Sequence, residues 1–353
     1  MGVTLADISR KAGVSITTVS KVLAGKAESF GIRKQTQEKV WRTARELDYA
    51  PNLRARSLRA KRSNQIGIVV AHFNDPWYGQ VIHGFESVLV RNDYGFVINS
   101  IEEDPSKLAM RINRMRANQI DGLILVGSRL DLPGPMAQRL KADDLPVTLF
   151  NRKSQWPWVS SVTFDHAHTG MISAQHLVEL GHRRIGMLLG PPNDPGNEVR
   201  IAGCRGALAQ VGVDFDPNDG EFAEPLGGFD SCRNGYQAIM RLLRRRTDLT
   251  AVVAFDDSVA FGAMRAAADM GVRIPADLSI IGVDDSFHAE YANPSLTTIR
   301  LPSGQAAETA AERMLEMLAT DRKASKPVHL EFKGTLVVRG STAPPHAGKE
   351  DAS

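Results

Sequence analysis

Cysteine is scarce in this chain: only Cys204 and Cys232 occur among 353 residues. Two cysteines are too few for a disulfide scaffold, and neither has a second cysteine close enough to make a zinc-ligand pair. We therefore expect both to be buried or inert thiols, which suits a reducing cytoplasm.

The sequence also lacks long apolar runs. The N-terminal segment MGVTLADISRKAGVS contains no apolar core of signal-peptide length, and runs such as Ile66–Ala71 are far too short to span a membrane. We expect a soluble, cytoplasmic protein with no membrane partner.

Motifs that carry enzyme chemistry are missing as well. The sequence has no GxxxxGK[ST] phosphate loop and no GxGxxG, HExxH or GxSxG motif. His166 and His168 follow a predicted strand at i, i+2 spacing, which is more typical of ordinary loop residues than of metal ligands. We predict no catalytic residue, no metal site and no cofactor, and a sugar-acting enzyme is the distant alternative.

Positive charge, by contrast, is concentrated near the N-terminus. Residues 1–62 hold 14 Lys and Arg against 5 Asp and Glu, a net charge of +9, whereas the rest of the chain carries −6. A basic head on an acidic body indicates a polyanionic partner, although a solvated basic face is the simpler alternative. The length favours two or three domains.

The head predicts two short helices joined by a sharp turn. Thr4 and Asp7 form a capping-box variant at the start of a helix over Leu5–Ala12, and a glycine ends it. Ser15 is the N-cap of a second helix over Ile16–Leu23. The side chains expected to be buried in this second helix are Val19, Val22 and Leu23.

A third helix is predicted over residues 34–47. Its apolar stripe contains Val40, Trp41, Ala44 and Leu47, which would supply the core that two short helices lack. The whole arrangement predicts a helix-turn-helix, whose second helix lies in the DNA major groove. A small structural bundle is the alternative.

Residues 50–63 are basic and have no continuous apolar stripe. Pro51 suits the first turn of a helix, but a helix this short is marginal in water. Leu58 among arginines suggests a minor-groove wedge in a segment that folds on DNA. From the residues alone, a charged linker is the better explanation.

Several spaced segments together resemble the LacI/GalR (lactose-repressor) family. The resemblance implies a homodimeric repressor of a palindromic double-stranded DNA operator. It also implies an all-α helix-turn-helix head, a hinge helix ordered on the operator, and an α/β periplasmic-binding-protein-like effector domain of two doubly wound parallel-sheet subdomains. The segments stand in family order as far as about Arg339: VTLADISRKAGVSITTVSKVL, TQEKVWRTARELDYAPNLRARSL, DGLIL, HLVELGHRRIGMLLGP, RIAGC, FDDSVAFGAMRAAADMGVRIPADLSIIGVDD and NPSLTTI.

The resemblance also implies which residues contact DNA. Ile16, Thr17 and Lys21 match base-reading positions, Leu58 matches the intercalating hinge leucine, and other residues of the second helix match positions near phosphates. The full predicted set is Thr4, Ser15, Ile16, Thr17, Thr18, Ser20, Lys21, Arg33, Asn52, Ala55, Arg56 and Leu58.

One turn departs from the family pattern. The segment AGKAESFGIRKQ is about three residues longer than usual, and Arg33 stands where a serine usually caps the third helix. The lost side-chain cap would cost about 1 kcal/mol, or Arg33 would instead add a phosphate contact. The sequence leaves both readings open.

Beyond residue 63, short β-rich apolar runs alternate with helical stretches, which is typical of a parallel α/β fold. The resemblance adds three crossings between the subdomains, near residues 164, 292 and 326. The predicted boundaries are 1–49 for the head, 50–63 for the hinge, 64–163 with 293–325 for the N-subdomain, 164–292 with 326–340 for the C-subdomain, and 341–353 for a flexible tail without heptads. The predicted strands are Gln65–Ala71, Gly95–Ser100, Asp121–Gly127, Pro146–Asn151, Val162–Asp165, Arg184–Gly190, Ala251–Asp256 and Leu278–Asp284.

Ligands of open parallel sheets bind beyond the carboxyl ends of the strands, where this sequence places carboxylates, an arginine and aromatic residues. This set suits a sugar, and a nucleoside or nucleobase is the alternative. Any single aspartate could instead cap a helix, and the aromatic pair could pack between subdomains. A transport-type solute-binding protein would leave the basic head unexplained. The residues predicted to bind the effector, on the family motifs, are Trp77, Tyr78, Asp165, Arg200, Phe229, Phe255, Asp256 and Asp284.

Overall fold

The computed structural model describes residues 3–49, 62–102, 104–213, 220–222, 230–319 and 326–346. The chain divides into two compact units, residues 1–63 and 64–353, and each is described by itself. Some predicted site residues lie outside the described residues, namely Asn52, Ala55, Arg56 and Leu58 of the predicted hinge and Phe229 of the predicted pocket.

Three helices form the head, as the sequence predicts: α1 (Leu5–Ala12), α2 (Ile16–Leu23) and α3 (Lys34–Glu46). A 3₁₀ turn, η1 (Glu28–Phe30), lies between α2 and α3. The prediction that Trp41 belongs to the core is wrong, because this side chain is 45% exposed. One residue along a helix turns the side chain by about 100°, so Trp41 faces away from the core that its neighbour reaches. The buried core consists of Ile8, Ala12, Val19, Val22, Ala27, Val40 and Ala44.

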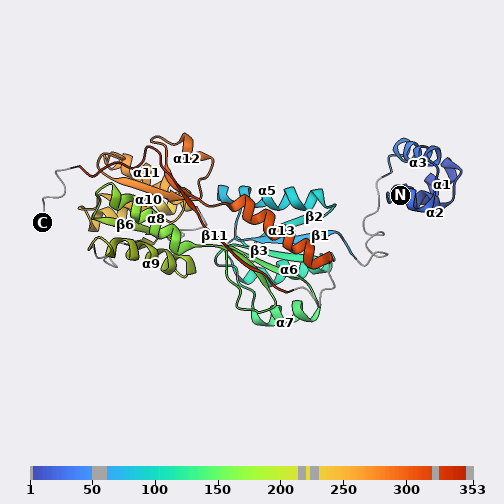
Figure 1. The fold of residues 1–353 in the computed structure, drawn as a ribbon, viewed down its shortest axis with the longest axis horizontal. Coiled ribbons are helices and arrows are strands. Elements are labelled where there is room, and N and C mark those ends of the chain that lie inside the picture. The colour runs from blue at the N-terminus through green and yellow to red at the C-terminus, as the bar shows by residue number, and fades with distance from the viewer. Residues whose placement is uncertain are drawn as a thin grey trace. The chain divides into compact units, whose positions relative to one another are not determined.

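Within the described residues, the second unit contains two six-stranded sheets, one in each subdomain (Figure 1). Their strand orders are β11-β5-β4-β3-β1-β2 and β12-β10-β9-β8-β6-β7. Neighbouring strands run parallel except for the antiparallel pair β10 and β12, which confirms the predicted fold class. The strands are β1 (Gln65–Val70), β2 (Gly95–Ser100), β3 (Gly122–Val126), β4 (Val147–Phe150), β5 (Ser160–Phe164), β6 (Ile185–Leu189), β7 (Gly220–Phe222), β8 (Ala251–Ala254), β9 (Ser279–Val283), β10 (Thr297–Arg300), β11 (His329–Phe332) and β12 (Thr335–Val337).

All eight predicted strands are present, but β7, β10, β11 and β12 were not predicted. Each of the four is only three or four residues long. β7, β11 and β12 are also edge strands, and β11 alternates between exposed and half-buried residues. Short strands of this kind carry little of the apolar signal on which the predictions depend.

The chain crosses between the subdomains three times, and two of the predicted crossings are misplaced. The first follows β5, near residue 164 as predicted. Because β10 pairs with β9, the second crossing lies near residue 301 rather than 292. Because β11 pairs with β5 while β12 pairs with β10, the third lies near residue 333 rather than 326.

The predicted flexible tail is also wrong over its first residues. Ser341 is fully buried, its carbonyl oxygen accepts a bond from Ile280 N at 2.9 Å, and its Oγ donates to Ile280 O at 2.6 Å. The carbonyl oxygen of Ala343 accepts a bond from His182 Nε2 at 2.8 Å. Residues 341–343 therefore belong to the body.

Helices cover both faces of the sheets, and α5 lies against α13 in the N-subdomain (Figure 1). Their contact is so close that a Cβ atom at Gly84 would lie 2.5 Å from the carbonyl oxygen of Gly304. No larger residue fits there without moving one helix. The helices are α5 (Pro76–Arg91), α6 (Ser106–Ala117), α7 (Gly134–Ala142), α8 (His166–Glu179), α9 (Pro195–Ala209), α10 (Ser231–Arg245), α11 (Asp257–Asp269), α12 (His288–Tyr291) and α13 (Ser303–Ala319).

Neither cysteine is set up for reaction. Cys204 is buried and Cys232 is exposed, and desolvation raises the pKa of the two thiols to about 12 and about 11. Both stay protonated near neutral pH. In the part of the chain that the structure describes, no helix is both long and apolar enough to cross a bilayer.

Candidate functional site

The predicted base-reading residues lie on the open face of α2. Ile16 is 51% exposed and Thr17 is exposed, whereas Val19 and Val22 are buried on the opposite face. Ser15 caps the helix by accepting a hydrogen bond from Thr18 N at 3.1 Å. The N-terminal turn of α2 is therefore fixed in place, while Ile16 and Thr17 stay exposed to a partner.

Lys21 has a neighbour that the sequence analysis missed. Its Nζ lies 3.3 Å from the ring centroid of Phe30, which is exposed and belongs to η1 in the longer turn. A cation over an aromatic face is attracted by the ring quadrupole. The extra residues of the turn therefore place an aromatic platform beside a predicted base-reading lysine.

Two other predicted head residues lie at helix starts. Thr4 and Asp7 complete the predicted capping box, with Thr4 N and Oγ1 donating to the Asp7 carboxylate at 3.0 and 2.6 Å. Arg33 is exposed and is the N-cap of α3, and within the described residues its side chain makes no capping hydrogen bond. The structure thus confirms that α3 lacks a side-chain cap.

A cavity of about 80 Å³ lies in the body and is lined by residues of both subdomains. Six of the predicted effector-binding residues meet there: Trp77, Tyr78, Arg200, Phe255, Asp256 and Asp284. Leu301 also lines it. Lining residues that the sequence analysis did not assign to the site include His72, Asp75, Ser128, Arg129, Asn151, His166 and Asp194.

Asp165 does not line the cavity. It is the N-cap of α8 and accepts a hydrogen bond from His168 N at 2.8 Å. The helix-capping alternative therefore describes Asp165, whereas the next residue, His166, reaches the cavity from the first turn of α8.

His166 is not a loop residue, contrary to the prediction. Its Nδ1 lies 3.1 Å from Arg200 Nη2, and its Nε2 lies 3.1 Å from Asn151 Oδ1. Because a guanidinium only donates, Nδ1 must accept and Nε2 must carry the proton. Desolvation, together with the charge of Arg200, lowers the pKa of His166 to about 3, so the ring is neutral. Among the described residues, no group of three possible metal ligands comes together.

Arg200 is the central cation of the cavity and is only 4% exposed. Its Nη1 donates to the carbonyl oxygen of Phe255 at 2.8 Å, and its guanidinium carbon lies 4.6 Å from the centroid of the Phe255 ring. Desolvation lowers the pKa of the Arg200 guanidinium. The side chain is thus fixed by its neighbours rather than free to follow a ligand.

Three of the cavity's carboxylates belong to Asp256, which is buried, and to Asp75 and Asp284, which are half-buried. Asp75 caps α5 by accepting from Trp77 N at 2.9 Å, and Asp256 caps α11 by accepting from Val259 N at 2.7 Å. For both residues, helix capping and cavity lining occur together. Burial, reinforced by the charge of Asp75, raises the pKa of Asp256 and Asp284 well above 3.8.

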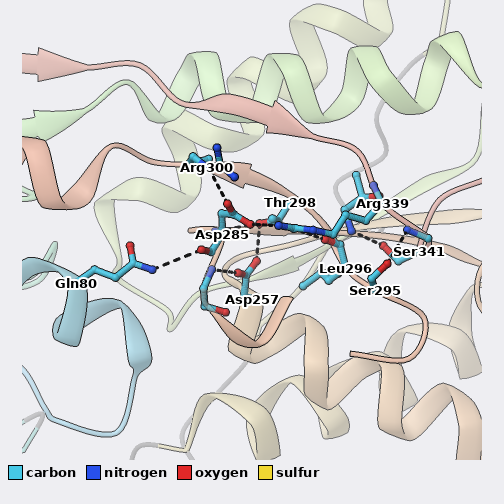
Figure 2. Close-up of polar contacts among 12 residues, drawn as sticks. Gln80, Asp257, Asp285, Ser295, Leu296, Thr298, Arg300, Arg339 and Ser341 are labelled. Carbon is cyan, nitrogen blue, oxygen red and sulfur yellow. Dashed lines mark hydrogen bonds and ion pairs between the residues drawn. The ribbon is translucent and has the colours of Figure 1, made fainter. Parts of the chain in front are cut away.

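The loop after β9 is held by a network of ion pairs and hydrogen bonds (Figure 2). Asp285 accepts from Arg300 Nε and from Arg339 Nη2, each at 2.6 Å. Both Asp284 and Asp285 have positive φ angles, 110° and 51°. The φ of Asp284 lies outside the left-handed region that Asp tolerates, so the clamp on Asp285 holds the adjacent Asp284 in its place in the cavity.

The aromatic pair belongs to the N-subdomain core as well as to the cavity. Trp77 Nε1 donates to Ser303 Oγ at 2.8 Å, and its ring packs against Phe150 and Phe164. The ring of Tyr78 lies edge-on to Trp77 with centroids 5.0 Å apart. The two rings therefore form a rigid wall of the cavity.

Comparisons with known proteins agree along the whole chain. The family described as bacterial regulatory proteins, lacI family, matches residues 4–52, and the periplasmic binding protein-like domain matches residues 174–342. The HTH-type transcriptional regulator DegA of Bacillus subtilis (strain 168) is 31% identical, over 98% of this chain and 99% of its own. The ribose operon repressor of Haemophilus influenzae is also 31% identical, over 96% of this chain and 98% of its own. The crystal structure of the lac repressor dimer bound to operator and the anti-inducer ONPF superposes with a TM-score of 0.83, at 28% identity, over 97% of this chain and 100% of that one.

Proposed function

This chain belongs to the lacI family of bacterial regulatory proteins, and we propose that it represses transcription from a palindromic operator as a homodimer controlled by a sugar. That it is a DNA-binding transcriptional repressor and not an enzyme follows from the family itself. The observation that carries the sugar proposal is the cavity in which Arg200 and two aspartates face an aromatic wall.

The DNA-binding part of the proposal predicts direct base contacts from α2. Thr17→Ala should lower affinity for the preferred duplex by about 5- to 150-fold and relax preference at one base pair. The duplex is found by selecting random sequences on the full-length protein. Arg45→Ala, an exposed charge change on α3 outside the predicted set, is the matched control. Equal affinity and an unchanged selected sequence for the Thr17 variant would contradict the assignment.

Salt dependence separates base contacts from phosphate contacts. Removal of a lysine that neutralises a phosphate reduces the slope of log affinity against log salt by about one. Lys21→Ala therefore reports whether this residue contacts a phosphate or, as proposed, a base, in which case the slope changes less than the affinity. If the slope of log affinity against log salt falls by about one and the sequence preference is unchanged, Lys21 contacts a DNA phosphate and not a base.

The homodimer proposal is supported by an exposed aromatic pair. Phe287 and Tyr291 are 69% and 73% exposed, and their ring centroids are 5.4 Å apart. Adjacent exposed aromatics of this size usually mark an interaction surface. Phe287→Glu should halve the mass measured by sedimentation equilibrium, whereas Val211→Glu, a similar change at another exposed apolar residue, should not. A variant that remains dimeric would place the contact elsewhere.

The effector proposal predicts a ligand that binds only the folded body. Hydroxyl groups bond strongly to ionised side chains, and ring C–H faces lie on aromatic walls. A bound sugar should therefore raise the melting temperature, which is measured by a thermal-shift screen of sugars and nucleosides. Asp284→Ala and Arg200→Ala should abolish that shift and retain operator binding. Stabilisation by a nucleoside but not by any sugar would replace the sugar proposal.

Control of DNA binding requires a difference in effector affinity between two states of the body. We propose that the angle between the subdomains is the difference, since the cavity is lined from both. The effector then changes operator affinity, and the operator changes effector affinity by the same factor. Unequal factors in the two titrations would contradict a simple two-state coupling.

A further inference from the structure

Of the helices that begin at the cavity, three have an N-cap residue that lines it: α5 from the N-subdomain, and α9 and α11 from the C-subdomain. A helix N-terminus carries free N–H groups and the positive end of the helix dipole, which makes it a ready site for phosphate or carboxylate. A cavity with three such ends would ordinarily attract an anionic ligand.

Here each of the three ends already holds a carboxylate of the protein. Asp75 accepts from Trp77 N at 2.9 Å, Asp194 from Gly196 N at 2.8 Å, and Asp256 from Val259 N at 2.7 Å. All three aspartates also line the cavity. The protein's own anions thus occupy the positions where a ligand anion would bind.

The cations of the cavity are engaged as well. Arg200 donates to the carbonyl oxygen of Phe255 and to His166, and the Phe255 ring covers one side of it. Arg129 lies in the field of Asp194. Against these two arginines stand four carboxylates, because Asp284 joins the three caps.

The carboxylates also affect one another. Burial and the nearby charge of Asp75 both raise the pKa of Asp256 and of Asp284. The site is therefore already unfavourable for negative charge before any ligand enters. A ligand with a phosphate or carboxylate would add to this repulsion.

We infer that the cavity selects an uncharged ligand and rejects phosphorylated or carboxylated forms of the same molecule. This inference rests on the proposed sugar response, and it narrows that response to neutral sugars. The discrimination comes from the three capping aspartates rather than from the size of the cavity.

The test pairs each neutral compound with its phosphorylated form in thermal-shift and calorimetric titrations of the full-length protein. Ribose is paired with ribose 5-phosphate and glucose with glucose 6-phosphate, and inorganic phosphate alone is a further arm. For any pair that binds, we expect the phosphorylated member to bind at least about 100-fold more weakly, as like-charge contacts require. Inorganic phosphate at millimolar concentration should leave the melting temperature unchanged.

A variant with fewer carboxylates should gain affinity for the phosphorylated ligand. Asn caps helices as well as Asp does, so Asp75→Asn with Asp256→Asn should keep α5 and α11 intact while removing two charges. This double variant should reduce the gap between neutral and phosphorylated ligand by about tenfold or more. Asp230→Asn is the matched control, because Asp230 caps α10 in the same way without lining the cavity.

The outcomes are distinct. Tighter binding of a phosphorylated member, or stabilisation by inorganic phosphate that Arg200→Ala abolishes, would overturn this inference and leave the sugar-controlled repressor standing. Binding of nucleosides but of no sugar would instead overturn the proposed sugar response. The inference would then be judged on each nucleoside against its 5′-monophosphate, with the same variants.

Discussion

Ser128 Oγ donates a hydrogen bond of 2.5 Å to a carboxylate oxygen of Asp194. Ser128 follows β3 in the N-subdomain, and Asp194 caps α9 in the C-subdomain, so the bond joins the two subdomains at the cavity. The other carboxylate oxygen of Asp194 still accepts from Gly196 N. The Ser128–Asp194 bond therefore holds the two subdomains together, whereas the N-cap of α9 does not depend on it.

Ser128→Ala should shift the body toward an open cleft by about 10- to 150-fold, because a hydrogen bond to a charged group contributes roughly 1.5–3 kcal/mol. Spin labels at Met110→Cys and Val211→Cys, in a Cys232→Ser background, report the distance between subdomains. The variant should show a larger share of long distances. Ser106→Ala, which breaks an equivalent bond to Asp104 within one subdomain, should not. Identical distance distributions would show that the contact does not set the cleft angle.

Arg33→Ser should stabilise the head by about 1 kcal/mol, because serine would supply the side-chain cap that α3 lacks. Slower hydrogen exchange of the first amides of α3 is the expected readout. The salt dependence of operator affinity, measured on the same variant, shows whether Arg33 contacts a DNA phosphate or only leaves α3 without a side-chain cap. A reduced salt slope would assign it a phosphate contact, and unchanged exchange would refute the predicted cap.

Asp257 should make the body less stable as pH rises toward 7. Burial raises its pKa to about 7, although Thr298 Oγ1 and Ser286 N both donate to it. An acid whose pKa is higher in the folded state binds more protons when folded. Its contribution is therefore fully present below its ordinary pKa of 3.8 and is lost as pH approaches 7.

Asp257→Asn removes that proton and keeps the side-chain shape. The free energy of unfolding of the variant relative to the wild type should therefore increase between pH 4 and pH 7, by at most roughly 1.4 kcal/mol per pH unit. Urea unfolding at several pH values measures this difference. A difference that stays constant with pH would mean that Asp257 does not titrate in this window.

The two arginines that hold Asp285 should contribute unequally (Figure 2). Arg339 is mostly buried and also donates to Leu296 O at 2.8 Å, whereas the side chain of Arg300 is mostly exposed. Arg339→Ala should cost about 3 kcal/mol of unfolding free energy, and Arg300→Ala less than about 1. Arg313→Ala, which breaks an exposed pair with Glu316, is the control. Equal losses in denaturant titrations would contradict the role of burial.

The sequence predicted the head better than the cavity, and the reason is physical. Helix starts such as Thr4 and Ser15 are local signals that caps and periodicity determine within a few residues. An aspartate after a strand carries the same local signal whether it faces a cavity or not. Asp165 and Asp256 both cap helices, yet only Asp256 lines the cavity, because the packing of distant segments decides which side it faces.

The cavity residues that were not predicted from the sequence also depend on the packing of distant segments. Asp194 and His166 reach the cavity through contacts between subdomains, which no short segment reveals. Phe30 was detectable in principle, since an aromatic residue in an inserted polar turn is unusual. β11 was missed because it forms by pairing with β5, more than a hundred positions earlier in the chain.

The consecutive strands β11 and β12 belong to different sheets, which has a consequence for the folding of the chain during translation. The basic head has its own core and leaves the ribosome first, yet the first sheet is complete only after residue 332 and the second only after residue 337. A nascent chain thus presents its DNA-reading helix long before either half of its ligand cleft is finished. A premature stop codon upstream of residue 329 removes an edge strand from both halves at once, which leaves a DNA-reading head on a body that has lost part of both sheets.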